Sequence, residues 1–344
     1  MKSNKKFFGL DIGTNSIRLA QLDNSSNTFP RNLIKYAVTP VESKIISSEA
    51  KTDRDELASI IKNLVAQANL NTNNVAVGIS SNKVFTAIVD VDKLKPSEMK
   101  KSIEFQADTF IPTPLADSII DWSILGDSPK DVSKQELLIS STSKDFATAQ
   151  LELIESAGLN VIALEPDVLA ISRSLIKPND VDTILIIDIG NRYTDLVVLI
   201  QNNLRLSRSI PIGTESFVRS ISQNLNSEAK QSEQFLYKFG LSKDKLEGQI
   251  FQSISNTVEN LMVEVDKSIK FFYSRYNNKI SKVVVAGTGA ILPEFPVFVA
   301  NRLSIPVEIG NAWLNVNYDP TIRPDLMAIS NQFSVAVGLA ERQE

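Results

Sequence analysis

The sequence predicts an α/β protein built from two related halves. Aligned on Asp11 and Asp188, the stretches DIGTNSIRLAQL and DIGNRYTDLVVL share an Asp, an Ile, a Gly and two Leu positions. Each stretch joins two apolar runs through a polar turn, which is typical of a β-hairpin. Segments with a 3.6-residue apolar period alternate with such runs and indicate helices. A chain of 344 residues also has room for about two domains of roughly 150 residues each.

The first half, residues 1–180, is expected to begin with a hairpin over Phe7–Leu22, followed by a helix and a short strand at residues 53–69 and 75–79. Residues from about 84 to 160 are predicted to form an inserted subdomain. Its expected elements are strands at 84–91 and 136–140 and helices at 96–110 and 145–158. Two prolines, Pro112 and Pro114, end the first of these helices, because the residue before a proline avoids the helical conformation.

The second half, residues 181–344, repeats the hairpin and is expected to carry a helical subdomain over about 211–280. Thr214 is predicted to cap the first helix of that subdomain. A long amphipathic helix follows at 250–276, and its aromatic residues are predicted to lie in the core: Phe271, Phe272, Tyr273 and Tyr276. The remaining expected elements are a strand at 282–285, a helix starting near Pro293 and a short helix at 334–340.

The composition excludes several classes of function. The chain has no Cys and no His, which excludes Ser-His and Cys-His catalysis, thiol redox chemistry and zinc sites built on imidazole or thiolate. A net charge of −4 gives no basic excess for general nucleic-acid binding. No apolar stretch approaches the ~18 residues that cross a bilayer, and the basic start is followed by only a short apolar run. These features predict a soluble, cytoplasmic protein.

Two turns of the form Asp-x-Gly, one in each half, point to a nucleotide. A turn of Gly and small polar residues directs several backbone N–H groups at one spot and forms an anion nest. Gly13 and Gly190 let an oxygen approach the backbone closely. A carboxylate beside such a turn repels phosphate unless a cation lies between them, so Asp11 and Asp188 suggest Mg²⁺, held mostly through water.

A third turn, Gly287-Thr288-Gly289, follows a strand and precedes a helix. Free N–H groups and the helix dipole at such a place favour a phosphate or a ribose edge. The three turns together predict a nucleotide cleft between the halves.

The order of two phosphate loops and an adenosine motif resembles the actin/Hsp70/hexokinase-like ATPase superfamily. Within it, the chain resembles the PilM family of type IV pilus assembly proteins, which is related to the division protein FtsA. The stretch EFQADTFIPTP at 104–114 is similar to that family's E-A-x-x-Y-I-P-F-P helix end. Leu164-Glu165-Pro166 resembles its connecting motif, and AGTGAILP at 286–293 is similar to G-G-G-A-x-L-P-G. The resemblance extends from Phe8 to Ala340.

The resemblance implies two RNase H-like domains of the actin-like ATPase type, with an FtsA/PilM-type subdomain inserted in the first. It also implies ATP and Mg²⁺ as cofactors. The first phosphate loop would be Asp11, Gly13, Thr14 and Asn15, and the second would be Asp188, Gly190, Asn191 and Thr194. The adenosine would be faced by Glu233, Gly287, Thr288 and Gly289.

The resemblance further implies an adaptor at the inner face of the cytoplasmic membrane. Such a protein binds a short N-terminal peptide of a PilN-like membrane partner and links it to pilus motor components, touching the membrane only through partners. The peptide groove would lie between the first domain and its insertion. Phe105 and Phe110 either line that groove or pack in the core.

Several residues depart from the family pattern. Arg192 and Tyr193 occupy the second loop, where small residues are usual, so Arg192 either pairs with phosphate or fills the site. Thr288 replaces the middle glycine of the adenosine turn, and Leu236 replaces an expected lysine, with Lys238 displaced by two positions. Asp188 is the one candidate base by position, and an ordinary carboxylate is a poor base at neutral pH. At most a slow ATPase is expected.

Two other readings stay open on the same fold. One is a small-molecule kinase of the sugar or acetate kinase type, which would need an acceptor-activating Asp and a substrate pocket. The other is a filament-forming protein like FtsA.

Overall fold

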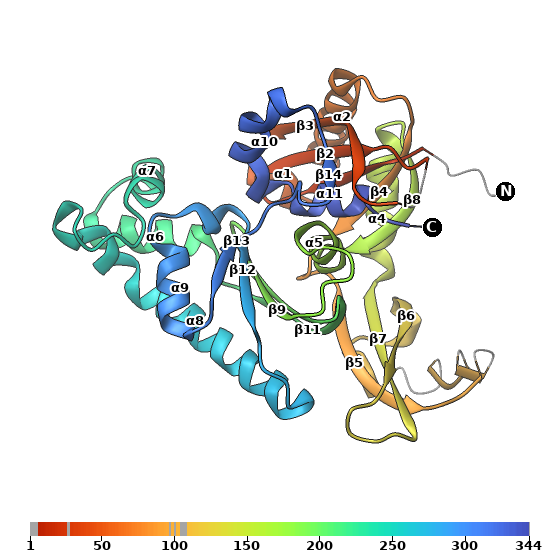
Figure 1. The fold of residues 1–344 in the computed structure, drawn as a ribbon. Helices are drawn as coiled ribbons and strands as arrows, with labels where there is room; N and C mark the ends of the chain where they lie inside the picture. Colours follow the sequence, from red (N-terminus) through yellow and green to blue (C-terminus); the bar gives the residue numbers. More distant parts are fainter. Residues whose placement is uncertain (1–5, 26–27, 96–97, 100, 104–108, 344) are drawn as a thin grey trace. The chain divides into compact units, whose positions relative to one another are not determined.

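The computed structural model describes residues 6–25, 28–95, 98–99, 101–103 and 109–343 (Figure 1). The chain divides into two compact units. The first unit comprises residues 1–171, 203–207 and 335–344, and the second comprises residues 172–202 and 208–334. The sequence had suggested a single division at 180/181. Three elements cross between the units: α5 (Asp167–Leu175), β11 (Asn203–Ile210) and α11 (Ser334–Ala340).

The first unit is centred on a mixed sheet. Its strands lie in the order β3 (Arg31–Pro40), β2 (Ser16–Leu22), β1 (Phe8–Ile12), β4 (Asn74–Ile79) and β8 (Asn160–Pro166). The pairs β3–β2 and β2–β1 are antiparallel, whereas β4 is parallel to both β1 and β8. The predicted hairpin is therefore confirmed. β3 and β8 were not predicted, because half-buried positions interrupt their apolar pattern.

Three helices complete this part of the first unit: α1 (Ser43–Ser47), α2 (Lys51–Ala68) and α4 (Lys144–Ser156). Leu57, Ile61 and Leu64 on α2 pack into one core with side chains of β1, β2 and α4, as the 3.6-residue period predicted. Gly158 follows α4 with φ +83°, in the left-handed region. The absence of a side chain at Gly9 and Gly338 lets the C-terminal helix pack closely against the rest of the first unit. A Cβ on Gly9 would lie 2.2 Å from the Ala336 carbonyl oxygen.

The insertion in the first unit contains an antiparallel sheet in the order β5 (Phe85–Asp92), β7 (Lys134–Ser143), β6 (Ser118–Asp127). A 3₁₀ turn at Leu115–Asp117 precedes β6. β6 was not predicted, because it is an edge strand with few buried side chains. The helix expected over 96–110, including Phe105, lies largely outside the described residues.

A buried ion pair joins β11 to this inserted sheet. The Arg205 Nε atom lies 3.6 Å from the Glu136 Oε2 atom, and the Glu136 side chain is only 1% exposed. Arg205 also donates from Nη2 to the Leu125 carbonyl oxygen at 3.1 Å. Leu125 lies where the β6–β7 register shifts, so the arginine satisfies a carbonyl in an irregular part of the ladder.

The second unit repeats the arrangement of the first. Its strand order is β11, β10 (Thr194–Ile200), β9 (Thr183–Ile189), β12 (Lys282–Ala286) and β13 (Val307–Ile309), and residues 208–210 of β11 belong to this unit. β9 and β10 form the second predicted hairpin, and β12 runs parallel to β9 as β4 does to β1. The prediction of two related halves is therefore confirmed at the level of topology.

Helices α6 (Thr214–Leu225), α7 (Ala229–Phe239) and α8 (Gln249–Tyr276) pack together in the second unit. It also holds α9 (Phe295–Leu303), α10 (Arg323–Ile329) and the short strand β14 (Val316–Asn317). Among the described residues, no helix combines the length and the apolar character that crossing a membrane requires.

The aromatic end of α8 corrects one prediction. Phe272 is fully buried, as expected, and Tyr276 is partly buried. Phe271 and Tyr273, however, are 63% and 47% exposed. Consecutive helical residues are about 100° apart, so the neighbours of a residue at the centre of the buried face point away from the core.

Candidate functional site

The first predicted phosphate loop is the turn between β1 and β2 in the first unit. The Gly13 N–H donates to the Ser16 carbonyl oxygen at 3.0 Å and closes the turn. Asp11 and Arg18 face each other in the hairpin register, and Arg18 Nη1 lies 3.0 Å from Asp11 Oδ2. Arg18 Nη2 also donates to Ser16 Oγ at 2.6 Å. Thr14 is half-buried and Asn15 is exposed at the tip of the turn.

The Asp11–Arg18 ion pair changes the charge of this loop. Both side chains are less than a tenth exposed. Burial raises the pKa of Asp11, while the charge of Arg18 and its hydrogen bond act in the opposite direction. The positive charge that the sequence analysis assigned to Mg²⁺ beside Asp11 is therefore supplied by a side chain of the protein.

Arg18 is not among the predicted site residues, although the sequence contains a signal for it. Once Ile12 and Ile17 pair across the turn, Asp11 and Arg18 must be opposite one another on the same face of the hairpin. Gly13 is also explained by this residue, because a Cβ at Gly13 would lie 2.9 Å from Arg18 Nη1. The glycine thus leaves room for the guanidinium as well as for a ligand.

The second predicted phosphate loop is the turn between β9 and β10 in the second unit. The Gly190 N–H donates to the Tyr193 carbonyl oxygen at 2.9 Å, which repeats the closure of the first turn. Here Asp188 faces Asp195 in the register. Asp195 occupies the position that Arg18 occupies in the first stretch, so this hairpin brings two carboxylates to the place where the other holds an ion pair. Carboxylate oxygens suit Mg²⁺.

The N-terminus of α6 is hydrogen-bonded to the second loop. The N–H groups of Thr214 and Glu215 donate to the carbonyl oxygens of Gly190 and Asn191 at 3.1 and 2.8 Å. Thr214 Oγ1 donates to Asn191 Oδ1 at 3.3 Å. The N-cap residue is Gly213, so the prediction that Thr214 caps this helix is wrong. Gly213 is needed there because a Cβ would lie 2.5 Å from the Asn191 carbonyl oxygen.

Two other residues of the second loop have internal partners. Thr194 is fully buried and donates from Oγ1 to the Ile212 carbonyl oxygen at 2.7 Å, so its hydroxyl braces the loop. Arg192 lies on the partly exposed side, with Nε 3.2 Å from Glu215 Oε2. Arg192 therefore pairs with an acid of α6 in this structure.

The predicted adenosine turn packs directly on the second loop. Gly287 has φ +77°, and a Cβ there would lie 2.4 Å from the Ile189 carbonyl oxygen and 2.5 Å from Asp188 Oδ1. A Cβ on Gly289 would lie 2.4 Å from Ile189 Cγ2. Thr288 begins a 3₁₀ turn, Thr288–Ile291, and Oγ1 donates to the Ile189 carbonyl oxygen at 3.4 Å. These glycines are thus required by packing, whatever ligand they face.

α7 contributes the last predicted residues. Glu233 is exposed, whereas Leu236 is fully buried in the core. A lysine could not take the place of Leu236 without losing its hydration. The helix ends at Gly240, and the next N–H, from Leu241, donates to the Pro293 carbonyl oxygen at 2.9 Å. α7 is therefore attached to the segment that follows the adenosine turn.

The second unit thus brings Asp188, Gly190, Asn191, Gly287 and Thr288 together around one pair of packed turns. The first unit holds Asp11, Gly13, Thr14 and Asn15 in a separate turn. Within the described part of the chain, no group of three or more Asp and Glu side chains is placed to hold a metal ion. A magnesium ion here would accordingly take water or phosphate oxygens as further ligands.

Solved structures with a similar fold include a PilM–PilN type IV pilus biogenesis complex, at 23% identity and TM-score 0.83, with 98% of each chain covered. The ethanolamine utilization protein EutJ from Carboxydothermus hydrogenoformans matches at 15% identity and TM-score 0.59, covering 97% of this chain and 88% of that one. MreB 5 of Spiroplasma citri bound to AMPPNP matches at 14% and 0.54, covering 98% and 95%. These likenesses show the two-domain actin-like fold.

The family described as type IV pilus assembly protein PilM matches residues 9–344, nearly the whole chain. The expected fold and family are both confirmed. The chain belongs to the PilM family of type IV pilus assembly proteins.

Proposed function

We propose that this protein is a nucleotide-binding adaptor of type IV pilus assembly. The observation that carries the proposal is the packing in the second unit. The adenosine turn lies so close to the second phosphate loop that a Cβ at Gly287 would lie 2.5 Å from Asp188 Oδ1. Two turns that pack against each other can present backbone N–H groups and a carboxylate to the same ligand. The solved MreB 5 structure, which shares the fold, contains AMPPNP.

The ligand is ATP with Mg²⁺. Asp188 and Asp195 supply a donor set that fits this ion, since they face each other in the hairpin register and Mg²⁺ takes one or two carboxylates with phosphates and waters. Bound there, the ion would neutralise phosphate charge. The ion pair with Arg18 makes Asp11 a weaker candidate ligand for magnesium than the sequence analysis assumed.

The first loop binds phosphate through the backbone around Gly13 and the side chains of Thr14 and Asn15. Arg18 adds a positive charge directly beneath this turn, and Asp11 holds its guanidinium in place. In the second loop, Gly190 and Asn191 face the phosphates, while Thr194 braces the loop from within. Glu233 and the Gly287–Gly289 turn face the adenosine.

ATP acts mainly as a conformational ligand and turns over slowly or not at all. Asp188 is the candidate base, and a carboxylate is a weak base unless its pKa is raised. A ligand that binds one conformation more tightly shifts the population toward it, and this needs no hydrolysis.

The adaptor's partner is a PilN-like membrane protein that offers a short peptide from its N-terminal, cytoplasmic end. The support is the solved PilM–PilN complex, with which this chain shares its fold over 98% of both chains. Recognition of such a peptide would hold this protein at the inner face of the cytoplasmic membrane and link it to the pilus motor. Phe110 is partly buried and packs against the buried cluster of the insertion that includes Met99 and Ile103, which favours a role in the core.

A thermal melt with and without Mg-ATP tests the nucleotide part of this proposal. A ligand at a hundred times its dissociation constant stabilises the folded state by about 2.7 kcal/mol, which raises Tm by several degrees. We expect this shift in the wild type and a loss of most of it in Asp188→Ala and Asp195→Asn. The matched control is Glu294→Gln, an exposed residue outside the predicted loops. No shift in nucleotide-free wild-type protein would exclude ATP as the ligand.

A further inference from the structure

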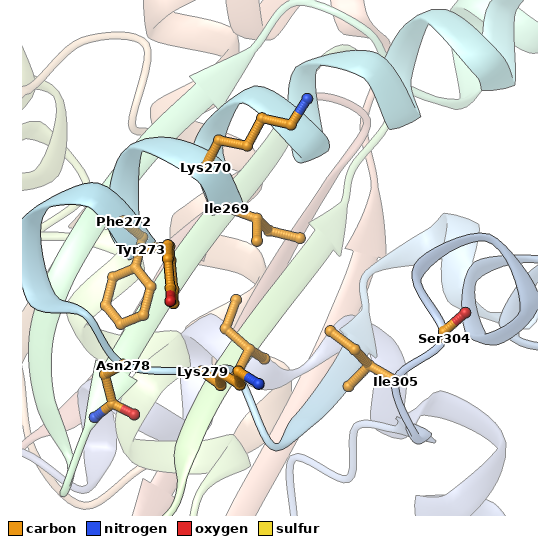
Figure 2. Close-up of a pocket in the computed structure, with 9 residues that line it drawn as sticks. Ile269, Lys270, Phe272, Tyr273, Asn278, Lys279, Ser304 and Ile305 are labelled. Atoms are coloured by element: carbon orange, nitrogen blue, oxygen red, sulfur yellow. The ribbon is translucent and has the colours of Figure 1, made fainter.

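The second unit carries a mostly apolar hollow at the C-terminal end of α8 (Figure 2). Its volume is about 450 Å³. Three segments form its walls: the last turns of α8, the link from α8 to β12, and the link from α9 to β13. None of the predicted nucleotide-binding residues lines it, so it is a feature separate from the site described above.

The walls of the hollow combine buried core side chains with partly exposed ones. Ile269 from α8 and Ile305 from the α9–β13 link approach it from opposite sides (Figure 2). Tyr273, which the sequence placed in the core, lines it and is 47% exposed. A tyrosine offers an apolar ring and a polar hydroxyl at little conformational cost, which is why tyrosines are enriched at binding surfaces.

Two lysines give the hollow a positive rim. Lys270 and Lys279 both line it and are exposed. No ion pair connects either lysine to another described residue. The nearby acids on α8 already have partners, because Glu264 pairs with Arg208 and Lys267, and Asp266 pairs with Arg302. The rim therefore stays positive on a chain whose net charge is −4.

We propose that this hollow is a docking site for an acidic segment of a partner protein, in which an apolar side chain enters the hollow and flanking carboxylates meet Lys270 and Lys279. The volume lies near the lower end of the range for ligand pockets, roughly 300–1,000 Å³, and suits one or two side chains. Apolar contact supplies affinity, while the opposite charges select an acidic segment over a basic one.

The test uses ¹⁹F NMR of the full chain labelled with 3-fluorotyrosine. The chain has six tyrosines, so its spectrum is simple, and Tyr273→Phe assigns the resonance in the hollow. The probe is the peptide acetyl-Asp-Glu-Leu-Phe-Glu-Asp-amide, titrated to about 1 mM, a concentration that detects weak binding. Two comparison peptides replace Leu-Phe by Gly-Ser, or all four acids by Lys. We expect a saturable shift of the Tyr273 resonance with the first peptide only.

Charge reversal separates docking at this rim from general attraction. We expect Lys270→Glu combined with Lys279→Glu to weaken binding by about tenfold or more, consistent with the loss of two ion pairs and the gain of repulsion. The matched control reverses two exposed lysines of α2, Lys51→Glu and Lys62→Glu, and should leave the affinity unchanged.

Four results would overturn the proposal: no saturable shift with the acidic apolar peptide, an equal shift with the basic peptide, equal weakening by both pairs of variants, or a Tyr273 shift that depends on protein concentration alone. The last result would assign the hollow to a second copy of this chain. None of these outcomes depends on whether the protein binds ATP.

Discussion

At the residue scale, one aligned position gives the two hairpins opposite electrostatics. Arg18 neutralises Asp11 in the first, whereas Asp195 adds a second carboxylate to Asp188 in the second. A loop that contains its own cation can meet a phosphate directly. In the second hairpin the two carboxylates face each other, and like charges opposite each other are destabilising, so a bound cation would favour this arrangement. The repeat thus keeps the turn but places an ion pair in one copy and two facing carboxylates in the other.

Replacing Arg18 tests this assignment. We expect Arg18→Ala to lower the free energy of unfolding by about 3 kcal/mol at neutral pH, because it leaves Asp11 buried without its partner. Burial raises the folded-state pKa of Asp11 above its unfolded value, so stability falls as pH rises between those two pKa values. Without Arg18 this window extends to higher pH. The deficit should therefore shrink as pH falls toward about 4.

Urea unfolding across this pH range measures the effect. The control is Arg219→Ala, since Arg219 is an exposed residue that pairs with Glu215 at 3.5 Å. An exposed pair contributes about 1 kcal/mol or less. A deficit in Arg18→Ala that is the same at every pH would contradict the buried ion pair as its cause.

The site could be predicted in part from the sequence. The two hairpin patterns predicted the positions of the loops, because an Asp-x-Gly turn between two apolar runs has few structural alternatives to a β-hairpin. The hydrogen bonds that join residues 191–194 to residues 212–215 could not be predicted, because the two segments are about twenty residues apart in sequence. The local apolar pattern also does not predict which aromatic side chains at the end of α8 are buried. Phe272 is buried, whereas its neighbours Phe271 and Tyr273 are exposed.

At the element scale, most strands and helices followed from the apolar period. Several strands with an interrupted pattern, such as β3, β6 and β8, and the short helices α1 and α10 were not predicted. β6 exposes half of its residues and contains a register shift, and its sequence lacks the apolar–polar alternation that marks a half-buried strand. The sequence likewise did not predict that the adenosine turn packs tightly on the second loop, although it did predict a turn at these glycines. Those glycines have a measurable structural role of their own.

A pair of glycine substitutions separates close packing from backbone strain. Gly287 and Gly158 both have positive φ, +77° and +83°, but only Gly287 lacks space for a Cβ. We expect Gly158→Ala to cost about 1–2 kcal/mol, the usual penalty of the left-handed region. Gly287→Ala should cost clearly more, by about 1–3 kcal/mol, because the turn or the Ile189 backbone must move.

Chemical denaturation of the two variants measures this difference, and Mg-ATP melts of both add a functional readout. Gly287→Ala should also lose nucleotide stabilisation, because Asp188 is among the groups displaced. Equal stability of the two variants would show that the adenosine turn can shift without cost, and would remove the packing argument for one joined site.

At the scale of the whole molecule, the chain does not leave one unit before entering the next. Residues 203–207 and 335–344 return to the first unit after the second has begun. α5, β11 and α11 each belong partly to both units. Unfolding one unit therefore breaks elements that the other unit uses. This connectivity predicts a single cooperative unfolding transition.

Two tryptophans allow the prediction to be tested, because Trp122 lies in the first unit and Trp313 in the second. Variants with one tryptophan each report on one unit. Leu339 on α11 is fully buried and belongs to the first unit, so Leu339→Ala should cost about 2–5 kcal/mol there. If the units unfold together, this one substitution lowers the unfolding midpoint seen by Trp313 as much as that seen by Trp122. A shift confined to Trp122 would mean that the shared elements fray without coupling the units, and that a nucleotide held by one unit could not stabilise the other through them.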